Sequence, residues 1–344
     1  MISVALFPVS LLLAFCVGFA VRRGGVCALS GVEDLASGRG PAMFLSFLKA
    51  SGWVVLVTVP LSWIWPTVTL APAMAPSLLA LTGGMLYGVG AAINGACAFA
   101  TLSRLGSGDI SFSLTLVGMA AGYVAQAAIV GTVAHPPPLQ SPLAGPEPWV
   151  LALLLGVAAL LAAELVRLWR VDGFGRGRAR DGSGGKTGWD KGASMLVIGT
   201  GAGLLYAIHG AWMYTATLHD LVSGFPLAEE AWRLALLAAV LAGAAFSSRA
   251  KGIWRTTKRS PSVWAAHLGG GMLMGFGALL VPGGNDVLVL QAIPGLSPHA
   301  IPTYLAMCGG MALVLLIRRE AKGVRVHLVG RRRRRGTRTL QPGE

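Results

Sequence analysis

Nine apolar runs, each about 20 residues long, follow one another along the whole of this chain. A helix of that length crosses the ~30 Å hydrocarbon core of a bilayer. Within that core a helix satisfies all of its own backbone hydrogen-bonding groups. The sequence therefore predicts an all-α polytopic membrane protein with nine transmembrane helices. The predicted spans are residues 2–20, 41–61, 78–97, 110–133, 148–169, 193–209, 228–248, 264–282 and 299–317.

The distribution of charge supports these spans and orients them. Only 12% of the residues are charged, against roughly 25% in soluble domains. The net charge is +14, but Lys and Arg gather in segments 167–191, 249–259 and 318–338, all on one side of the nine spans. The positive-inside rule then predicts an outer N-terminus and a cytoplasmic C-terminus in a bacterial inner membrane. We expect these basic segments to contact anionic lipid, and we predict no nucleic-acid partner.

The first half of the chain is echoed by the second. Residues 18–124 match residues 204–311 in order, so that Gly24 recurs as Gly210. Repeats of about 100 residues are too long for a solenoid and are typical of two transporter halves around a shared site. Because one extra span joins the halves, we predict inverted repeats. The predicted parts are a first repeat (1–133), a linker span with a basic loop (134–192), a second repeat (193–317) and a basic cytoplasmic tail (318–344).

Each half contains two glycine-rich, partly polar breaks between its spans. They cover residues 23–35 and 94–109 in the first half, and 209–221 and 282–297 in the second. Each break is too short and too mixed to cross a membrane, and its glycines let the chain reverse. Irregular backbone at membrane depth occurs where it is buried in protein or lines a polar cavity. We therefore predict four short re-entrant helices that meet at mid-membrane, where their exposed N–H groups attract an anion.

Two cysteines occupy equivalent places in the breaks of the first half. Cys27 follows Gly-Gly-Val and Cys97 follows Asn-Gly-Ala. A helix start favours the thiolate of a cysteine placed there, and soft sulfur suits a soft anion such as thiosulfate. The alternative is that both thiols pack as small hydrophobic groups, which is our interpretation of Cys16 and Cys308 inside apolar spans. In the second half, Met213 takes the place of Cys27 and, with one inserted residue, Asn285 takes the place of Cys97.

Other polar residues in and beside the breaks have both a functional and a structural interpretation. His209 either supplies positive charge to an anion or lies at the membrane interface. Asp286 would repel an anion, so we expect it to face backbone amides as a helix cap. Arg104 and Asp109 are predicted to form a cytoplasmic ion pair. The candidate residues of a substrate path are Cys27, Cys97, Asn285, Gly24, Gly25, Gly95, Gly284 and His209.

The remaining glycines indicate helix packing, and the sequence contains none of the common catalytic motifs that we looked for. Gly84 with Gly88, and Gly271 with Gly275, have the spacing of closely packed helices. We find no nucleotide-binding loop, zinc-protease motif, haem pair or serine–histidine–acid pattern in the sequence. The sequence therefore predicts a protein that is not an enzyme, with no catalytic residue, no metal and no cofactor.

Three segments resemble the YeeE/YedE sulfur-transport family. They are Gly24-Gly25-Val26-Cys27, Gly95-Ala96-Cys97 with Arg104-Leu105-Gly106-Ser107-Gly108-Asp109, and Gly283-Gly284-Asn285. The resemblance implies an hourglass-shaped inner-membrane protein with inverted repeats. It also implies that thiosulfate passes along cysteine thiols through transient S–H hydrogen bonds, and that a cytoplasmic sulfur-carrier protein is a partner. The family usually has a further cysteine where this chain has Asn285, so sulfite and sulfate remain candidate substrates.

Three functional hypotheses follow from the sequence. The first is a permease for a small sulfur-containing anion, with thiosulfate as the leading substrate. The second is a membrane-embedded sulfur-transfer or redox enzyme, in which Cys27 and Cys97 form persulfides or a disulfide. The third is a scaffold that transports nothing and recruits a partner through its basic tail.

Overall fold

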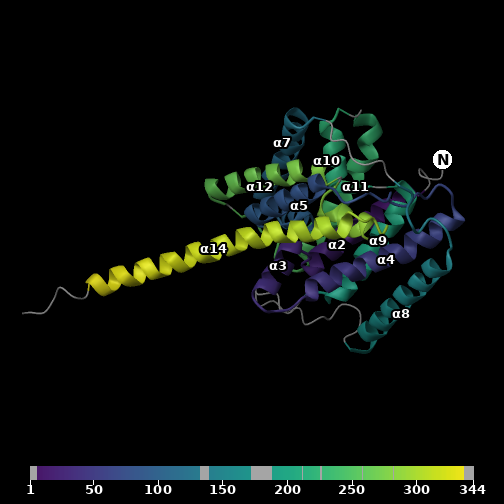
Figure 1. Ribbon diagram of the computed structural model, residues 1–344, viewed down its shortest axis with the longest axis horizontal. Helices are drawn as coiled ribbons and strands as arrows, with labels where there is room; N and C mark the ends of the chain where they lie inside the picture. Colours follow the sequence, from purple (N-terminus) through teal and green to yellow (C-terminus); the bar gives the residue numbers. More distant parts are fainter. Residues whose placement is uncertain are drawn as a thin grey trace, which may run out of the picture.

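A computed structural model describes residues 6–131, 139–171, 188–210, 212–224, 227–257, 259–281 and 283–336. Apart from one isolated bridge between Ala73 and Leu139, the regular structure of these residues is helical. Figure 1 shows long helices packed side by side, with short ones between them. The long helices are α2 (Phe7–Gly24), α4 (Ala42–Ile64), α5 (Leu78–Asn94), α7 (Ser113–Ile129), α8 (Pro148–Val171), α9 (Lys191–His209), α11 (Leu227–Ala250), α12 (Pro261–Leu280) and α14 (Ala300–Gly336). The short ones are α3 (Ala28–Ala36), α6 (Ala98–Gly106), η1 (Ile110–Phe112), α10 (Tyr214–Val222), α13 (Asn285–Val287) and η2 (Leu288–Ala292).

The described residues contain nine helical segments that are long and apolar enough to cross a membrane. This confirms the predicted all-α membrane architecture, and each long helix overlaps one predicted span. The largest difference lies at the end of the chain. Helix α14 does not end with the predicted span 299–317 but continues to Gly336, and its last turns project away from the other helices (Figure 1).

The helices pair in a pattern that treats the two halves alike. Helices α2 and α9 contact each other, and so do α5 and α12. Around the first pair, α2 contacts α11 while α9 contacts α4. Around the second pair, α5 contacts α14 while α12 contacts α7. The contact of α2 with α11 therefore corresponds to that of α9 with α4, and the contact of α5 with α14 to that of α12 with α7.

Glycine makes the closest of these contacts, as the spacing predicts. A Cβ atom on Gly88 of α5 would lie 2.0 Å from the backbone oxygen of Met307 in α14. A Cβ atom on Gly275 of α12 would lie 2.1 Å from the backbone oxygen of Met119 in α7. No side chain fits at those distances. The helix backbones can approach this closely only because both positions lack a Cβ atom.

The two central pairs are antiparallel. The end of α2 lies against the start of α9, where a Cβ atom on Gly24 would be 2.5 Å from Ser194 Oγ. At the other end of the same pair, Ser10 Oγ and His209 Nε2 are 2.8 Å apart. Helices α2 and α9 thus run in opposite directions past each other.

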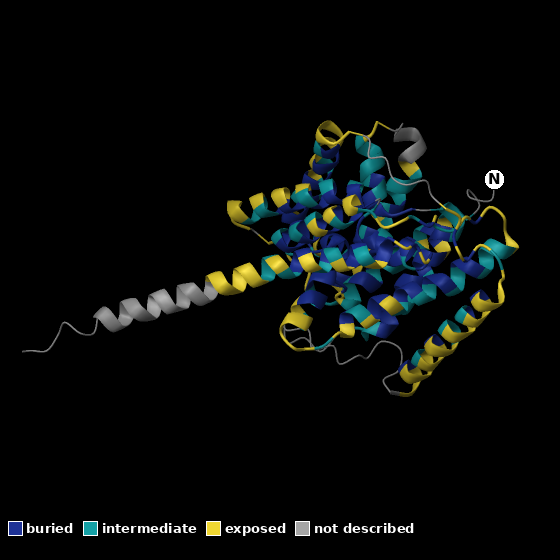
Figure 2. Ribbon diagram, viewed as in Figure 1, coloured by how far each residue is buried: buried dark blue, intermediate teal, exposed yellow. Residues whose placement is uncertain are grey.

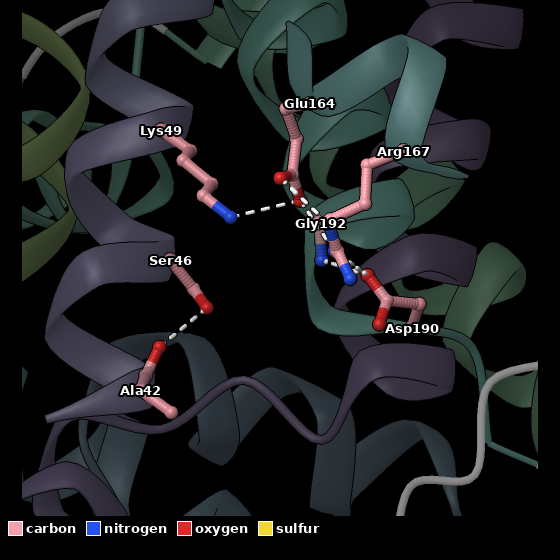
Figure 3. A network of polar contacts seen from close by, with 7 residues as sticks. All are labelled: Ala42, Ser46, Lys49, Glu164, Arg167, Asp190 and Gly192. Atoms are coloured by element: carbon pink, nitrogen blue, oxygen red, sulfur yellow. Dashed lines mark hydrogen bonds and ion pairs between the residues drawn. The ribbon is translucent and has the colours of Figure 1, made fainter. Parts of the chain in front are cut away.

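Helix α8 stands apart from both halves at the edge of the molecule (Figure 1), and most of its surface is exposed (Figure 2). A network of charged side chains holds it in place (Figure 3). Glu164 of α8 accepts from Lys49 Nζ of α4 at 2.8 Å and from its neighbour Arg167 at 2.6 Å. Arg167 also contacts Asp190, whose carboxylate caps the start of α9 by accepting from Gly192 N–H at 2.8 Å. The network therefore anchors α8 to one helix of each half.

Candidate functional site

The four predicted breaks each contain the start of a short helix. Helices α3, α6 and α10 begin after Cys27, Cys97 and Met213, which are their N-cap residues. Helix α13 begins after Gly284. Met213 is therefore equivalent to Cys27, as the sequence comparison indicated. The residue in the position of Cys97 is Gly284, so Asn285 lies one residue further on, inside the helix.

Glycines with positive φ make the turns that lead into these helices. Gly25 has φ of 60° and Gly95 has φ of 76°, two residues before each cysteine. Gly210 has φ of 74°, and Gly283, directly before Gly284, has φ of 134°. Residues with a Cβ atom rarely adopt this backbone conformation. Glycine is thus what lets each long helix end and a short helix restart at once in a new direction.

The starts of the short helices meet inside the molecule. The N–H of Ala28, the first residue of α3, donates to Cys97 Sγ at 3.2 Å. The Tyr214 hydroxyl, at the start of α10, donates to the carbonyl oxygen of Ala98 at 3.0 Å. The Thr215 hydroxyl lies 3.0 Å from each carboxylate oxygen of Asp286. Each half therefore contributes two helix starts to one centre.

The two thiols of the first half are in contact with each other. Cys27 is 6% exposed and Cys97 is fully buried, and their sulfur atoms lie within hydrogen-bonding reach. Both are free cysteines. A helix start donates to Cys97 Sγ, and donation of this kind stabilises negative charge on sulfur. The pair thus combines two soft sulfur atoms with a positively polarised backbone.

Asn94, the last residue of α5, fixes the turn that holds Cys97. Its Nδ2 donates to the carbonyl oxygen of Ala96 at 2.9 Å and to Thr101 Oγ1 at 3.2 Å. Its Oδ1 accepts from Thr115 Oγ1 at 2.7 Å and lies 2.8 Å from His267 Nδ1. The sequence alone did not indicate that Asn94 fixes this turn. An asparagine at a helix end, directly before a turn glycine, was the available signal.

Asp286 caps helix starts, as predicted. Besides the Thr215 hydroxyl, its carboxylate accepts from the backbone N–H groups of Thr215 and Val287 and from its own. Asp286 is 1% exposed. These neutral donors fix the carboxyl group at the start of α10. The start of α3, by contrast, faces Cys97 Sγ. The Asp286 side chain therefore occupies the start of α10, a position that would otherwise attract an anion.

Three polar side chains beside this centre have no hydrogen-bond partner among the described residues. They are the Tyr87 hydroxyl, the Tyr304 hydroxyl and both polar atoms of the Asn285 carboxamide. Tyr87 and Asn285 are fully buried, and Tyr304 is 9% exposed. The sequence predicted Asn285 as a residue of the substrate path, but it did not predict either tyrosine. The signal for them was a single hydroxyl inside an otherwise apolar span.

A cavity of about 50 Å³ lies beside the second half of the centre. Met213, Tyr214 and Asp286 line it, together with Trp212 and Phe99. Most of its wall is apolar. Neither Cys27 nor Cys97 belongs to the lining, so the cavity is adjacent to the thiol pair rather than part of it.

His209 lies apart from the other candidate residues. Its Nε2 is 2.8 Å from Ser10 Oγ, and its ring stacks on Trp232 with centroids 4.7 Å apart. Ser10 is near the first residue of α2, whereas Cys27 follows the last. Gly24, at that last turn, packs against Ser194. The structure thus brings together Cys27, Cys97, Asn285, Gly25, Gly95 and Gly284, but places His209 at the far end of α2.

The predicted pair of Arg104 and Asp109 is replaced by other partners. Asp109 Oδ2 accepts from Arg259 Nη2 at 2.7 Å, and Asp109 Oδ1 accepts from Ser111 Oγ. Burial alone would raise the pKa of Asp109, but Arg259 and Ser111 outweigh it and hold that pKa below its usual value. The Arg104 guanidinium lies 5.5 Å from the centre of the Phe112 ring. The chain turns sharply after α6, and this turn presents Asp109 to the segment before α12.

Comparison with known proteins adds one finding to this geometry. A family model described as sulphur transport matches residues 23–313. The match begins just before Cys27 and extends into α14, so it includes α3, α6, α10 and α13, the short helices that begin in the four breaks. No curated protein matches the chain. Within the described residues, no group of three or more His, Cys, Asp and Glu side chains is placed to hold a metal ion.

Proposed function

Because this chain belongs to the sulphur-transport family, also called YeeE/YedE, we propose that it is a permease for a small sulfur-containing anion, with thiosulfate as its first candidate substrate. The observation that carries this proposal is the contact between Cys27 and Cys97 where the short helices start. A multi-pass membrane protein has no mechanical reason to place two free thiols and several helix starts at one point. A transient anion site gives them a common purpose.

The chemistry of the thiol pair suits passage rather than tight binding. An S–H group is a weak donor, so an anion held by thiols forms hydrogen bonds that break easily. Backbone N–H groups at the helix starts supply positive potential without a cationic side chain. A site with this composition favours an anion with a polarizable sulfur end. We propose that the path runs past Cys27, Cys97 and Asn285, with the turn glycines shaping it.

We further propose that the two halves are inverted repeats. Two observations support this. Equivalent helices make equivalent contacts, and the central pairs α2–α9 and α5–α12 run antiparallel, as the positions of Gly24, Ser10 and His209 indicate for the first pair. Two halves related in this way expose their shared centre alternately or symmetrically to both sides of a membrane.

The proposed orientation has the N-terminus outside and the C-terminus in the cytoplasm of an inner membrane. Its support is the placement of the basic segments, of which 318–338 is the richest in Lys and Arg. In this orientation His209 lies toward the outer entrance of the path, because it is at the opposite end of α2 from the basic residues Arg22 and Arg23. A cytoplasmic sulfur-carrier protein would then meet the opposite side.

One observation favours a second candidate function, a membrane-embedded sulfur-transfer or redox enzyme. The contact between the Cys27 and Cys97 thiols brings two free cysteines together, and neighbouring cysteines form a disulfide where their geometry allows it. Mass spectrometry of the protein after exposure to thiosulfate distinguishes the two functions. A persulfide or a Cys27–Cys97 disulfide that depends on substrate would favour the enzyme, and unmodified thiols favour the permease.

Uptake by reconstituted vesicles tests the permease directly. Purified full-length protein is placed in liposomes, and entry of ³⁵S-labelled thiosulfate, sulfite and sulfate is measured. We expect thiosulfate to enter, and we expect Cys97→Ala to reduce its uptake by ~10-fold or more, since hydrogen bonds to a charged ligand are lost. Cys16→Ala is the matched control and should keep wild-type uptake. Asn285→Cys, which adds the thiol usual in the family, should still take up thiosulfate.

Two results would overturn the proposal. If wild-type vesicles take up none of the three anions, the assignment to sulfur anions is wrong. If Cys97→Ala and Cys16→Ala transport equally well, the thiol pair is not part of the path. The scaffold hypothesis predicts that second result together with loss of function when residues 318–344 are removed.

A further inference from the structure

Tyr87 and Asn285 present polar groups that nothing in the described part of the protein satisfies. Tyr87 lies on α5 and Asn285 is the first residue of α13, so they come from different halves. Both side chains are fully buried, yet the tyrosine O–H donates to nothing there and the carboxamide has no hydrogen-bond partner. The two residues are neighbours, because the backbone N–H of Asn285 is directed at the Tyr87 hydroxyl oxygen.

Such groups are costly unless something binds them. Buried polar groups are hydrogen-bonded in the great majority of native structures. Leaving a buried donor without a partner costs the whole desolvation of that group. Packing offers no compensation here, since Phe and Leu fill the same volumes without a polar atom. Two unsatisfied side chains side by side therefore indicate a ligand that accepts hydrogen bonds.

The position of this pair shows which part of a ligand it would meet. Tyr87 lies within electrostatic range of Cys97, and α13, which begins at Asn285, contacts α6, which begins after Cys97. The hydroxyl and the carboxamide are therefore neighbours of the thiol pair. Thiols suit a soft sulfur atom, whereas O–H and N–H donors suit hard oxygen atoms. A ligand that fits both kinds of group has a soft sulfur at one end and oxygens at the other.

We propose that the Tyr87 hydroxyl and the Asn285 carboxamide form the oxygen-binding half of the substrate site, and that they donate to the oxygens of an anion whose terminal sulfur faces Cys97. This inference rests on the proposed function, because it assigns residues to the same transported anion. It identifies the substrate class as sulfur oxyanions with a terminal, non-oxidised sulfur atom. Tyr304, which lies within electrostatic range of both Cys27 and Cys97, extends the same donor set toward Cys27.

Removing each donor without changing its volume tests the inference. Tyr87→Phe and Asn285→Leu are compared with wild type in vesicle uptake of thiosulfate. We expect each variant to raise KM by ~10-fold or more while the maximal rate changes less, because a hydrogen bond to the bound anion is lost. Tyr206→Phe is the matched control: Tyr206 is a buried tyrosine on α9, outside the cluster around the thiols. It should keep the wild-type KM.

Thermal unfolding in detergent separates binding from folding. Ligand that binds only the folded protein raises Tm, so thiosulfate should raise the Tm of wild type and of Tyr206→Phe. Without thiosulfate, Tyr87→Phe should melt at or above the wild-type temperature, because the lost O–H donated to none of the described groups. With thiosulfate, its Tm should rise much less than that of wild type.

The outcomes for the two proposals are distinct. If wild-type vesicles take up thiosulfate while Tyr87→Phe and Asn285→Leu keep its KM and its Tm shift, the oxygen-binding half is overturned and the permease stands. A lower Tm for ligand-free Tyr87→Phe would also overturn it, because the hydroxyl would then have a structural role. If wild type takes up no sulfur anion, both proposals fall.

Discussion

The two halves of this protein build the same centre with different chemistry. In the first half, the start of α3 faces a sulfur atom, since Ala28 N–H donates to Cys97 Sγ. In the second half, the start of α10 faces a carboxylate, since the Thr215 hydroxyl donates to Asp286. Both helix starts attract negative charge. One faces a polarizable thiol, and the other faces the carboxyl group of Asp286.

The difference shows how a repeated fold can divide its tasks. The Asp286 carboxyl group accepts hydrogen bonds from the Thr215 hydroxyl and from backbone N–H groups at the start of α10, so these bonds hold that end of the centre together. A thiol satisfies the start of α3 only weakly, because sulfur is a weak acceptor as well as a weak donor. An incoming anion can therefore compete for the first half more easily than for the second. In the proposed permease, the second half would stabilise the centre and the first half would exchange the anion.

Removing the Asp286 carboxyl group from the second half should have the largest effect on stability. Asp286→Ala leaves the Thr215 hydroxyl and several backbone N–H groups buried without a partner. Each orphaned donor costs roughly 1–3 kcal/mol, so we expect a loss of about 4 kcal/mol. Unfolding by SDS in mixed micelles measures it.

The matched variant is Thr215→Val, which removes one neutral donor and leaves the carboxylate with its backbone partners. Its expected loss is about 1 kcal/mol. If Asp286→Ala is as stable as Thr215→Val, the carboxylate does not hold the second half together. The contrast between the two halves would then lose its energetic basis.

The turn glycines offer a second way to test the contrast. A Cβ atom on Gly25 would meet nothing within 4 Å, so Gly25→Ala costs only backbone strain, about 1–2 kcal/mol. A Cβ atom on Gly283 would lie 2.6 Å from the side chain of Val287. Gly283→Ala adds this collision to the strain, and overpacking in cores costs roughly 1–3 kcal/mol.

We therefore expect Gly283→Ala to be less stable than Gly25→Ala by about 2 kcal/mol, measured in the same micelle titration. Equal losses would mean that Val287 moves aside and that the second half is no more tightly built than the first. A larger loss for Gly25→Ala would reverse the contrast.

Much of this architecture could be predicted from the sequence, because its causes are local. Apolar length predicts the long helices, and glycine spacing predicts the close contacts at Gly88 and Gly275. The starts of the short helices follow from turn glycines, which act within two or three residues of themselves. These features need no knowledge of what lies across the molecule.

The parts that could not be predicted depend on contacts between distant segments. Arg259 is the partner of Asp109 because the loop before α12 passes close to the end of α6, which no local pattern records. Asn285 was a candidate from the sequence, but Tyr87 became notable only when it was found buried and unpaired beside Asn285. His209 has the composition of a site residue, but the length of α2 separates it from the thiols. Residue type suggested the candidates, and only the packing could select among them.

The smallest expected effect concerns the acid of the first half. Asp286 is fully enclosed by neutral donors, whereas Asp109 lies at the end of α6 with Arg259, a side chain that is 40% exposed. Asp109→Asn removes this ion pair. Because solvent screens a partly exposed pair, we expect the variant to lose only about 0.5–1 kcal/mol near pH 7.

The stability difference between wild type and Asp109→Asn should depend on pH in a definite direction. The pKa of Asp109 is lowered in the folded protein, so its ionised form stabilises the fold above the ordinary aspartate pKa of about 3.9. That stabilisation is lost as the pH falls through the lowered value. The Tm difference between wild type and Asp109→Asn should therefore be constant from about pH 7 to pH 5 and shrink below about pH 4. A difference that grew in acid would mean that Asp109 is held in its protonated form and that Arg259 does not stabilise its charge.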